Sequence, residues 1–157
     1  MSTAPATPPE EIAAVHAPVD VMPRVPTRAE IEMLEREMLK RPQVEIKTTH
    51  HFAEGLYARE IFIPAGVLLT GKVHSGEHLN IVSQGEINVW TDDGMKTVCA
   101  PFTMVSRPGT KRVGLAIRDT VWTTIHANPT HTRDLAQLET LLIVSPQLTE
   151  GASPCLG

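Results

Sequence analysis

Three histidines have the residue type and the spacing for a shared binding site. His74 and His78 lie close together in the segment GKVHSGEHLNIV, and His126 ends the segment TVWTTIH. Side chains alternate between the two faces of a strand, so His78 shares a face with Asn80, and His126 shares a face with Trp122. If both faces line the interior of one barrel, the three imidazoles converge there.

Three neutral imidazoles are suitable ligands for a divalent metal such as Zn, Fe, Ni or Mn. With one coordination position left open, such an ion supports Lewis-acid or dioxygen chemistry. The same histidines are equally suited to be core or surface side chains that hydrogen-bond to their neighbours, and the sequence leaves both interpretations open. Glu77 is a further candidate ligand or general base, but strand alternation turns it away from His78.

The region 44–128 must position these residues. It consists of short runs rich in β-branched and aromatic residues, punctuated by Gly, Pro and Asp, which is typical of a small all-β barrel or jelly roll. Before it, the segment PTRAEIEMLEREMLKRP predicts a helix over about 28–40. Thr27 and Glu30 have the spacing of a capping box, and Pro42 ends the helix.

A second helix and two arms flank the barrel. The segment PTHTRDLAQLETLLI predicts a short helix over about 132–142, with Thr132 as its cap. Six prolines among the first 26 residues predict an extended arm without a helix or a ladder. The chain therefore divides into an arm over 1–26, a barrel domain with its flanking helices over 27–143, and a second arm over 144–157.

Composition excludes several classes of function. Charged residues make up 20% of the chain and the formal net charge is -4, so a basic surface for nucleic acid is not expected. The first residues lack the basic and apolar regions of a secretion signal, and no apolar run is long enough to span a membrane. Cys99 and Cys155 are too few for a disulfide framework. We therefore expect a soluble, non-secreted protein of a reducing compartment that binds neither nucleic acid nor membrane.

The segment GVLLTGKVHSGEHLNIVSQGEINV, followed by PFTMVSRPGTKR, resembles the two-motif core of the cupin superfamily over about residues 55–128. The resemblance implies a small β-barrel of a kind that commonly holds a divalent metal. Set against the family pattern, His74 falls on the second histidine of the first motif, and His78 stands where a glutamate is usual. Lys72 and Arg112 occupy the positions of the two remaining ligands.

Two cations at ligand positions change the expected chemistry. Lysine and arginine donate no lone pair at neutral pH, and both repel a dication, so the usual cupin metal site is expected to be absent. Lys72 and Arg112 in a pocket would favour an anionic small molecule. His126, from a different strand, is the residue that would complete a metal site with His74 and His78.

Three segments, EHLNIVSQGEINVWTDDG, PGTKRVGLAIRDTVWTTIHAN and TRDLAQLE, resemble cupin-like proteins encoded by tailed bacteriophages. This resemblance implies a protein made in the host cytoplasm, with a place in the virion and without an established enzymatic activity. From it and from the two arms we expect a non-enzymatic structural or assembly protein. It would form homo-oligomers and bind other virion proteins through its arms and the helix over 28–40. The alternative is a metal-dependent cupin enzyme or a small-ligand-binding protein that uses His74, His78 and His126.

Overall fold

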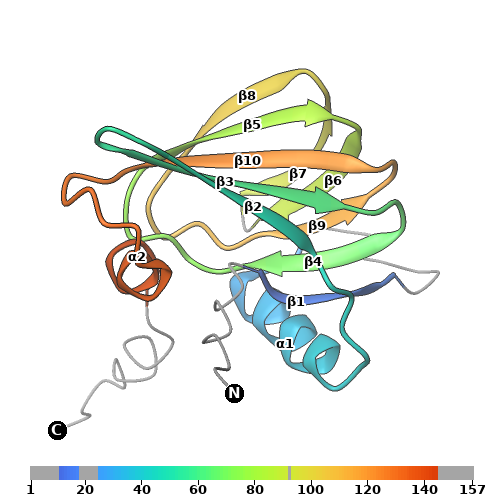
Figure 1. The fold of residues 1–157 in the computed structure, drawn as a ribbon. Coiled ribbons are helices and arrows are strands. Elements are labelled where there is room, and N and C mark those ends of the chain that lie inside the picture. The colour runs from blue at the N-terminus through green and yellow to red at the C-terminus, as the bar shows by residue number, and fades with distance from the viewer. Residues whose placement is uncertain (1–10, 18–24, 92, 145–157) are drawn as a thin grey trace, which may run out of the picture.

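The computed structural model describes residues 11–17, 25–91 and 93–144. Within them, one antiparallel sheet contains β1 (Glu11–His16), β4 (Val67–Gly71), β9 (Val113–Ala116), β6 (Glu86–Thr91) and β7 (Gly94–Cys99), in that spatial order. The other contains β2 (Lys47–Ala53), β3 (Leu56–Ile63), β10 (Thr120–Ala127), β5 (His78–Gln84) and β8 (Phe102–Ser106), again in spatial order. The two sheets pack face to face (Figure 1). This two-sheet jelly roll confirms the predicted all-β fold class.

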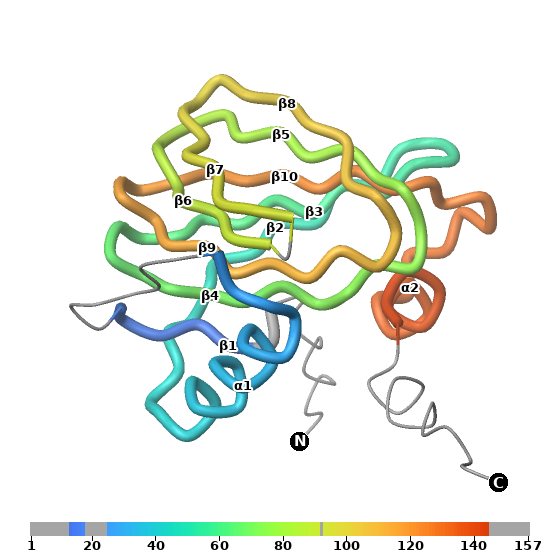
Figure 2. The backbone as a smooth tube through the Cα atoms, turned by 180° about the vertical axis from the view of Figure 1, so that it is seen from behind, coloured from blue at the N-terminus to red at the C-terminus, as the bar shows by residue number. Residues whose placement is uncertain are grey.

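Helix α1 (Arg28–Leu39) confirms the first predicted helix, including its capping box of Thr27 and Glu30. It lies against the outer face of β1 and β4, as the view from behind shows (Figure 2). Its buried side chains Ile31 and Met38 pack in one cluster with Leu68. Burial of such apolar side chains contributes about 1.5–3 kcal/mol each, which holds the helix on the barrel wall.

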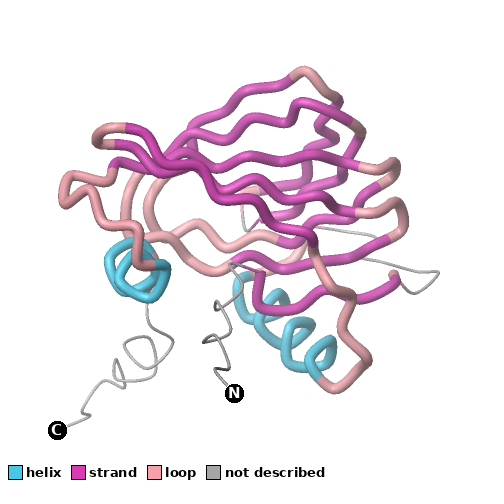
Figure 3. Tube along the Cα trace, in the orientation of Figure 1, coloured by secondary structure: helices cyan, strands magenta, loops and turns pink. Residues whose placement is uncertain are grey.

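Helix α2 (Leu135–Leu142) begins later than the predicted start at 132. The carboxylate of Asp134 accepts hydrogen bonds from the backbone N–H groups of Ala136 and Gln137, so Asp134 is the cap. The hydroxyl of Thr132, the predicted cap, instead accepts a hydrogen bond from the backbone N–H of Asp134. Figure 3 shows α2 at one end of the barrel, after a long connection from β10. Neither helix of the described ranges is long and apolar enough to cross a membrane.

The prediction that residues 1–26 form no ladder is wrong for residues 11–16, because β1 pairs antiparallel with β4. The prolines leave the window EEIAAVHA free of interruption, which permits a strand. Its alternation packs Ala13 and Val15 towards α1 and Ala14 into the barrel core. Residues 1–10 and 18–24 lie outside the described residues. So does 145–157, nearly all of the second predicted arm, and the domain division therefore stays a prediction.

The end of the barrel opposite α2 is closed by a tight turn between β5 and β6 at Gly85. Its φ of +93° lies in the left-handed region that favours glycine. A Cβ atom at this position would lie 2.3 Å from the carbonyl oxygen of Asp119. The turn therefore needs a glycine both for its backbone conformation and for its close packing.

Candidate functional site

Inward-facing side chains of three neighbouring strands build the candidate site near the end of the barrel where α2 lies. Every second side chain of these strands points into the interior, in agreement with their alternating burial. From this end towards the centre, the inward residues are Tyr57, Arg59 and Ile61 on β3, His126, Thr124 and Trp122 on β10, and His78, Asn80 and Val82 on β5. Polar and aromatic groups therefore gather at this end, and apolar groups fill the centre.

The structure brings His74, His78 and His126 together. Their ring centroids lie 4.2 Å apart for His74 and His78, and 4.8 Å apart for each of the two pairs with His126. All three side chains are buried. His74 follows β4 in a loop that is held by an isolated bridge to Ile143, just after α2. We call these three residues the histidine cluster.

One member of the histidine cluster has a defined tautomer. The Nδ1 atom of His78 lies 3.1 Å from the backbone carbonyl oxygen of Gly76. Because a carbonyl oxygen only accepts hydrogen bonds, Nδ1 carries the proton, and in the neutral ring the lone pair is on Nε2. Such a hydrogen bond commonly orients histidine ligands of metals.

The donor types of the histidine cluster fit a metal, but their arrangement does not. Within the described ranges, no group of three or more His, Cys, Asp or Glu side chains is arranged so that it could hold an ion. The buried Arg59 also lines the same space as His74 and would repel a dication. A metal at these histidines stays a prediction.

Ring contacts extend from His126 through Tyr57 to His50 on β2, the edge strand of the sheet. Tyr57 stacks on His126 with a centroid distance of 6.3 Å. Its hydroxyl lies 2.7 Å from Nδ1 of His50, which projects inwards from β2. The next residue, His51, faces outwards and lies 3.8 Å from a carboxylate oxygen of Glu60. The two adjacent histidines therefore have separate environments, as strand alternation predicts.

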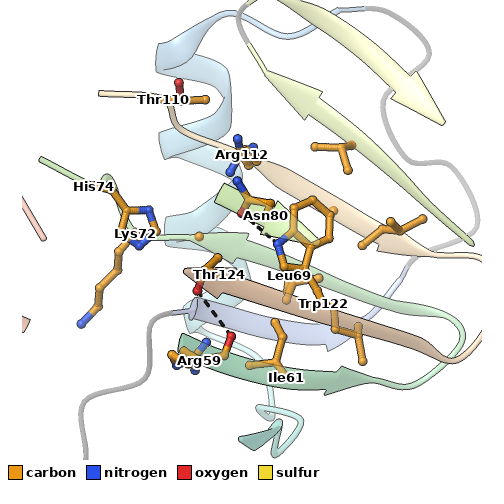
Figure 4. Close-up of a pocket in the computed structure, with 15 residues that line it drawn as sticks. Arg59, Ile61, Leu69, Lys72, His74, Asn80, Thr110, Arg112, Trp122 and Thr124 are labelled. Carbon is orange, nitrogen blue, oxygen red and sulfur yellow. Dashed lines mark hydrogen bonds between the residues drawn. The ribbon is translucent and has the colours of Figure 1, made fainter. Parts of the chain in front are cut away.

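A cavity of about 70 Å³ lies inside the barrel beside the histidine cluster. Its cationic lining residues are Arg59, Lys72 and Arg112, and none of the described residues that line it is acidic. The apolar part of its wall consists of Ile61, Ile63, Leu69, Ile87, Val89 and Trp122. We call this space the barrel cavity (Figure 4).

The two cations that sequence analysis placed in the pocket differ in orientation. Arg112 donates a hydrogen bond to the hydroxyl of Ser106, and its guanidinium lies 5.9 Å from the ring of Trp122. Lys72 forms an ion pair with Glu139 of α2 and extends away from Arg112 in Figure 4. The guanidinium of Arg112 therefore lies inside the barrel, whereas the ammonium of Lys72 lies against Glu139 of α2.

A buried hydrogen-bond network fixes the wall around Arg112. The indole N–H of Trp122 donates to Oδ1 of Asn80 at 3.0 Å, and Nδ2 of Asn80 donates to the hydroxyl of Ser106 at 2.6 Å. Ser106 thus accepts hydrogen bonds from both Asn80 and Arg112. A network of this kind holds its members in one geometry, because breaking any link leaves a buried polar group unsatisfied.

Helix α2 closes the barrel above the histidine cluster. A second cavity of about 40 Å³ lies between Leu135, Leu138 and Leu142 of the helix and the inward-facing Tyr57 and His126. Arg59 and His74 line both this space and the barrel cavity, so the two spaces are neighbours.

Sequence analysis did not select Arg59, Ser106 or Glu139. A signal for Arg59 exists, since alternation in LYAREIFI places one arginine on the same face as Tyr57, Ile61 and Ile63. A charged residue on the apolar face of a strand is rare enough to indicate a function. The pairing of Lys72 with Glu139 depends on tertiary structure and leaves no local pattern.

Comparisons with known proteins give a likeness of fold. No protein-family model and no curated protein matches the chain. Among solved structures, a cupin-like protein from Thermotoga maritima is 12% identical, with a TM-score of 0.46 over 55% of this chain and 70% of that chain. A cupin superfamily protein from Desulfitobacterium hafniense is 10% identical, with a TM-score of 0.47 over 58% of this chain and 84% of that chain. An acetylacetone dioxygenase from Acinetobacter johnsonii is 16% identical, with a TM-score of 0.44 over 52% of this chain and 59% of that chain.

The aligned region covers less than two thirds of the acetylacetone dioxygenase. The similarity to all three proteins concerns the fold at most. No activity passes from these proteins to this chain. The jelly roll rests on the pairing of the chain's own ten described strands. None of these similarities connects the chain to bacteriophages, so the phage origin, the virion partners and the host location stay predictions.

Proposed function

We propose that the protein binds a small organic anion inside the barrel. The observation that carries this proposal is the lining of the barrel cavity, which combines the side chains of Arg59 and Arg112 with an apolar wall; the guanidinium of Arg59 donates a hydrogen bond of 3.3 Å to the hydroxyl of Thr48. A guanidinium in a partly dehydrated site is a strong partner for a carboxylate, because it offers two parallel charge-assisted hydrogen bonds. The apolar wall suits a hydrocarbon chain.

The size of the barrel cavity limits the ligand. Its volume of about 70 Å³ has room for roughly five water molecules, because each needs about 10–15 Å³ in this measure. A short-chain monocarboxylate has a matching size. Its carboxylate would lie near Arg112 and Arg59, and its chain would contact Trp122 and the apolar wall. Butyrate is therefore a suitable probe.

Substitution of Arg112 tests the proposal. A hydrogen bond to a charged group contributes about 1.5–3 kcal/mol, so Arg112→Gln should weaken butyrate binding by about ten- to a hundredfold. Arg118→Gln is the matched control, since Arg118 is 76% exposed at the opposite end of the barrel. Trp122 lines the barrel cavity, so its fluorescence should report binding. Equal affinity in the two variants would reject a role for Arg112.

We also propose, as a separate function, that copies of the chain associate as the predicted homo-oligomer. The outer face of the sheet that contains β5 and β8 supports this. Leu79 pairs in register with Val105 on one side and Ile125 on the other. Leu79 is 43% exposed and Val105 is 58% exposed. An apolar row of this kind is self-complementary across a two-fold axis.

The oligomeric state can be measured by light scattering coupled to size exclusion. Leu79→Glu places a charge in the apolar row and should shift the protein towards monomer. Thr49→Glu is the control, because Thr49 is exposed on the outer face of β2 at the far edge of the same sheet. An identical mass for the unaltered protein and both variants would count against association through this face.

A further inference from the structure

A groove of about 300 Å³ lies beside the two strands that end the sheets, β7 and β8. Three of its lining residues, Val89, Thr110 and Arg112, also line the barrel cavity. The groove and the barrel cavity therefore lie on opposite sides of the same few side chains. We call this space the side groove.

The side groove lies between the edge strands of the two sheets. The ladder of β7 is with β6, and the ladder of β8 is with β5, so each of the two strands is the last of its sheet. No ladder of backbone hydrogen bonds joins β7 to β8 within the described residues, so a ligand that passes between them breaks no ladder. Thr110 and Arg112 are the polar side chains at the boundary with the barrel cavity.

The charge of the side groove favours anions. Among the described residues, its lining contains three cations, Lys96, Arg107 and Arg112, against one acid, Asp93, and these lining residues carry an excess of two positive charges. Lys96, on β7, has its ammonium 6.0 Å from the ring centroid of Phe102 on β8, which places its charge between the two strands. A cleft with an excess of one sign of charge concentrates ligands of the other sign and raises their association rate.

The end of the barrel that α2 covers is held closed by several contacts. Helix α2 is held by the ion pair of Lys72 with Glu139. Backbone hydrogen bonds of 2.8 Å join Ser75 to Leu142 and Val144 to Val73 on the same side. The side chain of Leu138, which belongs to α2, is only 2% exposed. Displacement of α2 would break all of these contacts, whereas passage through the side groove would not.

We propose that the side groove is the entrance through which small organic anions reach the barrel cavity. Exposed Arg107 and Lys96 attract the anion, which then passes Thr110 and exchanges to Arg112. Helix α2 is a fixed plug in this scheme. The inference rests on the proposed function, because it describes the route to the same cavity.

Association kinetics of ω-fluorobutyrate, followed by fluorine NMR line shapes on the full chain, test the steering charges. Arg107→Glu should lower the association rate about fourfold at low salt, which corresponds to reversal of one charge about 10 Å from the path in water. The difference should vanish at about 1 M salt, where the screening length is only about 3 Å. Arg118→Glu makes the same change in net charge at the far end of the barrel, and it should keep the original rate.

Two further variants separate the two routes. Met95→Trp places a large ring at the side groove, and it should slow association and dissociation by the same factor without a change in Kd. Leu138→Ala loosens the packing of α2 and should leave the association rate unchanged. A faster rate in Leu138→Ala, or equal rates in Arg107→Glu and Arg118→Glu, would overturn the side entrance while leaving the proposed function standing. Failure of ω-fluorobutyrate to bind at all would overturn both.

Discussion

Removal of Lys111 should weaken the attachment of α1 to the barrel wall and destabilise the protein. Lys111 precedes Arg112, and alternation sends the two cations to opposite sides, with Arg112 inside the barrel and Lys111 towards α1. Lys111 is 3% exposed, forms an ion pair with Glu35 of α1, and donates a hydrogen bond of 2.7 Å to the carbonyl oxygen of Gly71. Glu35 is itself only 14% exposed.

The expected magnitude follows from this burial. Loss of one partner of a buried ion pair costs about 3–5 kcal/mol, because the remaining charge is left in a poorly solvated place. Glu35 keeps some contact with water, so Lys111→Met should lower the free energy of unfolding by about 3 kcal/mol, and Tm by roughly 10 °C. Thermal and urea denaturation followed by circular dichroism would measure it.

Two comparisons make this prediction refutable. Lys40→Met removes the partner of an exposed pair with Glu37, and it should leave the denaturation midpoint nearly unchanged. The double variant Lys111→Met with Glu35→Leu should regain most of the lost stability, because it removes the isolated charge. If Lys111→Met is no less stable than Lys40→Met, the reasoning about the buried pair is wrong.

The pH dependence gives an independent readout of the same residue. Burial lowers the pKa of Lys111 below its ordinary value of 10.5, and the hydrogen bond to Glu35 opposes this shift. Between the lowered folded pKa and 10.5, the unfolded chain binds more protons, so this residue makes stability rise with pH. The difference in unfolding free energy between the unaltered protein and Lys111→Met should therefore widen as pH increases through that window.

Two further outcomes are expected. Gly85→Ala should lower the free energy of unfolding by about 3 kcal/mol, because the residue has a left-handed backbone and its added Cβ would clash with the carbonyl oxygen of Asp119. Gly66→Ala is the control, with φ of +83° and nothing within 4 Å of the added Cβ, and it should cost only about 1 kcal/mol. Urea denaturation of the two variants would measure the difference. If the histidine cluster holds a metal, elemental analysis should find a stoichiometric ion that disappears in His74→Ala and in His78→Ala. The ion should persist in the control variant His51→Ala. An unchanged metal content in all three variants would place the ion elsewhere.

Local patterns were sufficient to predict the first helix and the fold class. The Thr27 and Glu30 capping box, with Pro42 beyond the end, contains the whole signal for α1 within the segment itself. The short strands with Gly and Pro turns likewise predict a jelly roll without long-range information. At α2, Thr132 and Asp134 are both good caps two positions apart, and the residue types alone do not decide between them.

Long-range contacts explain what the sequence could not predict. Lys72 lines the barrel cavity, but its ammonium forms an ion pair with Glu139 of α2, and no local pattern shows that contact. The prolines around β1 argue against a strand there, whereas the strand is formed by pairing with β4, a partner about fifty residues further along the chain. Alternation alone correctly placed Trp122, Thr124 and His126 on one inward face, and the same rule applied to β3 would have found Arg59.

The most direct test of the central claim is a paired calorimetric titration of the unaltered chain with butyrate and with butyramide at matched ionic strength. The two ligands have nearly the same shape and differ in charge, so the comparison isolates the guanidinium groups of the barrel cavity. We expect one butyrate per chain, bound at least about tenfold more tightly than butyramide. Equal affinity for the two ligands, or binding of neither, would contradict the account of an anion site inside the barrel.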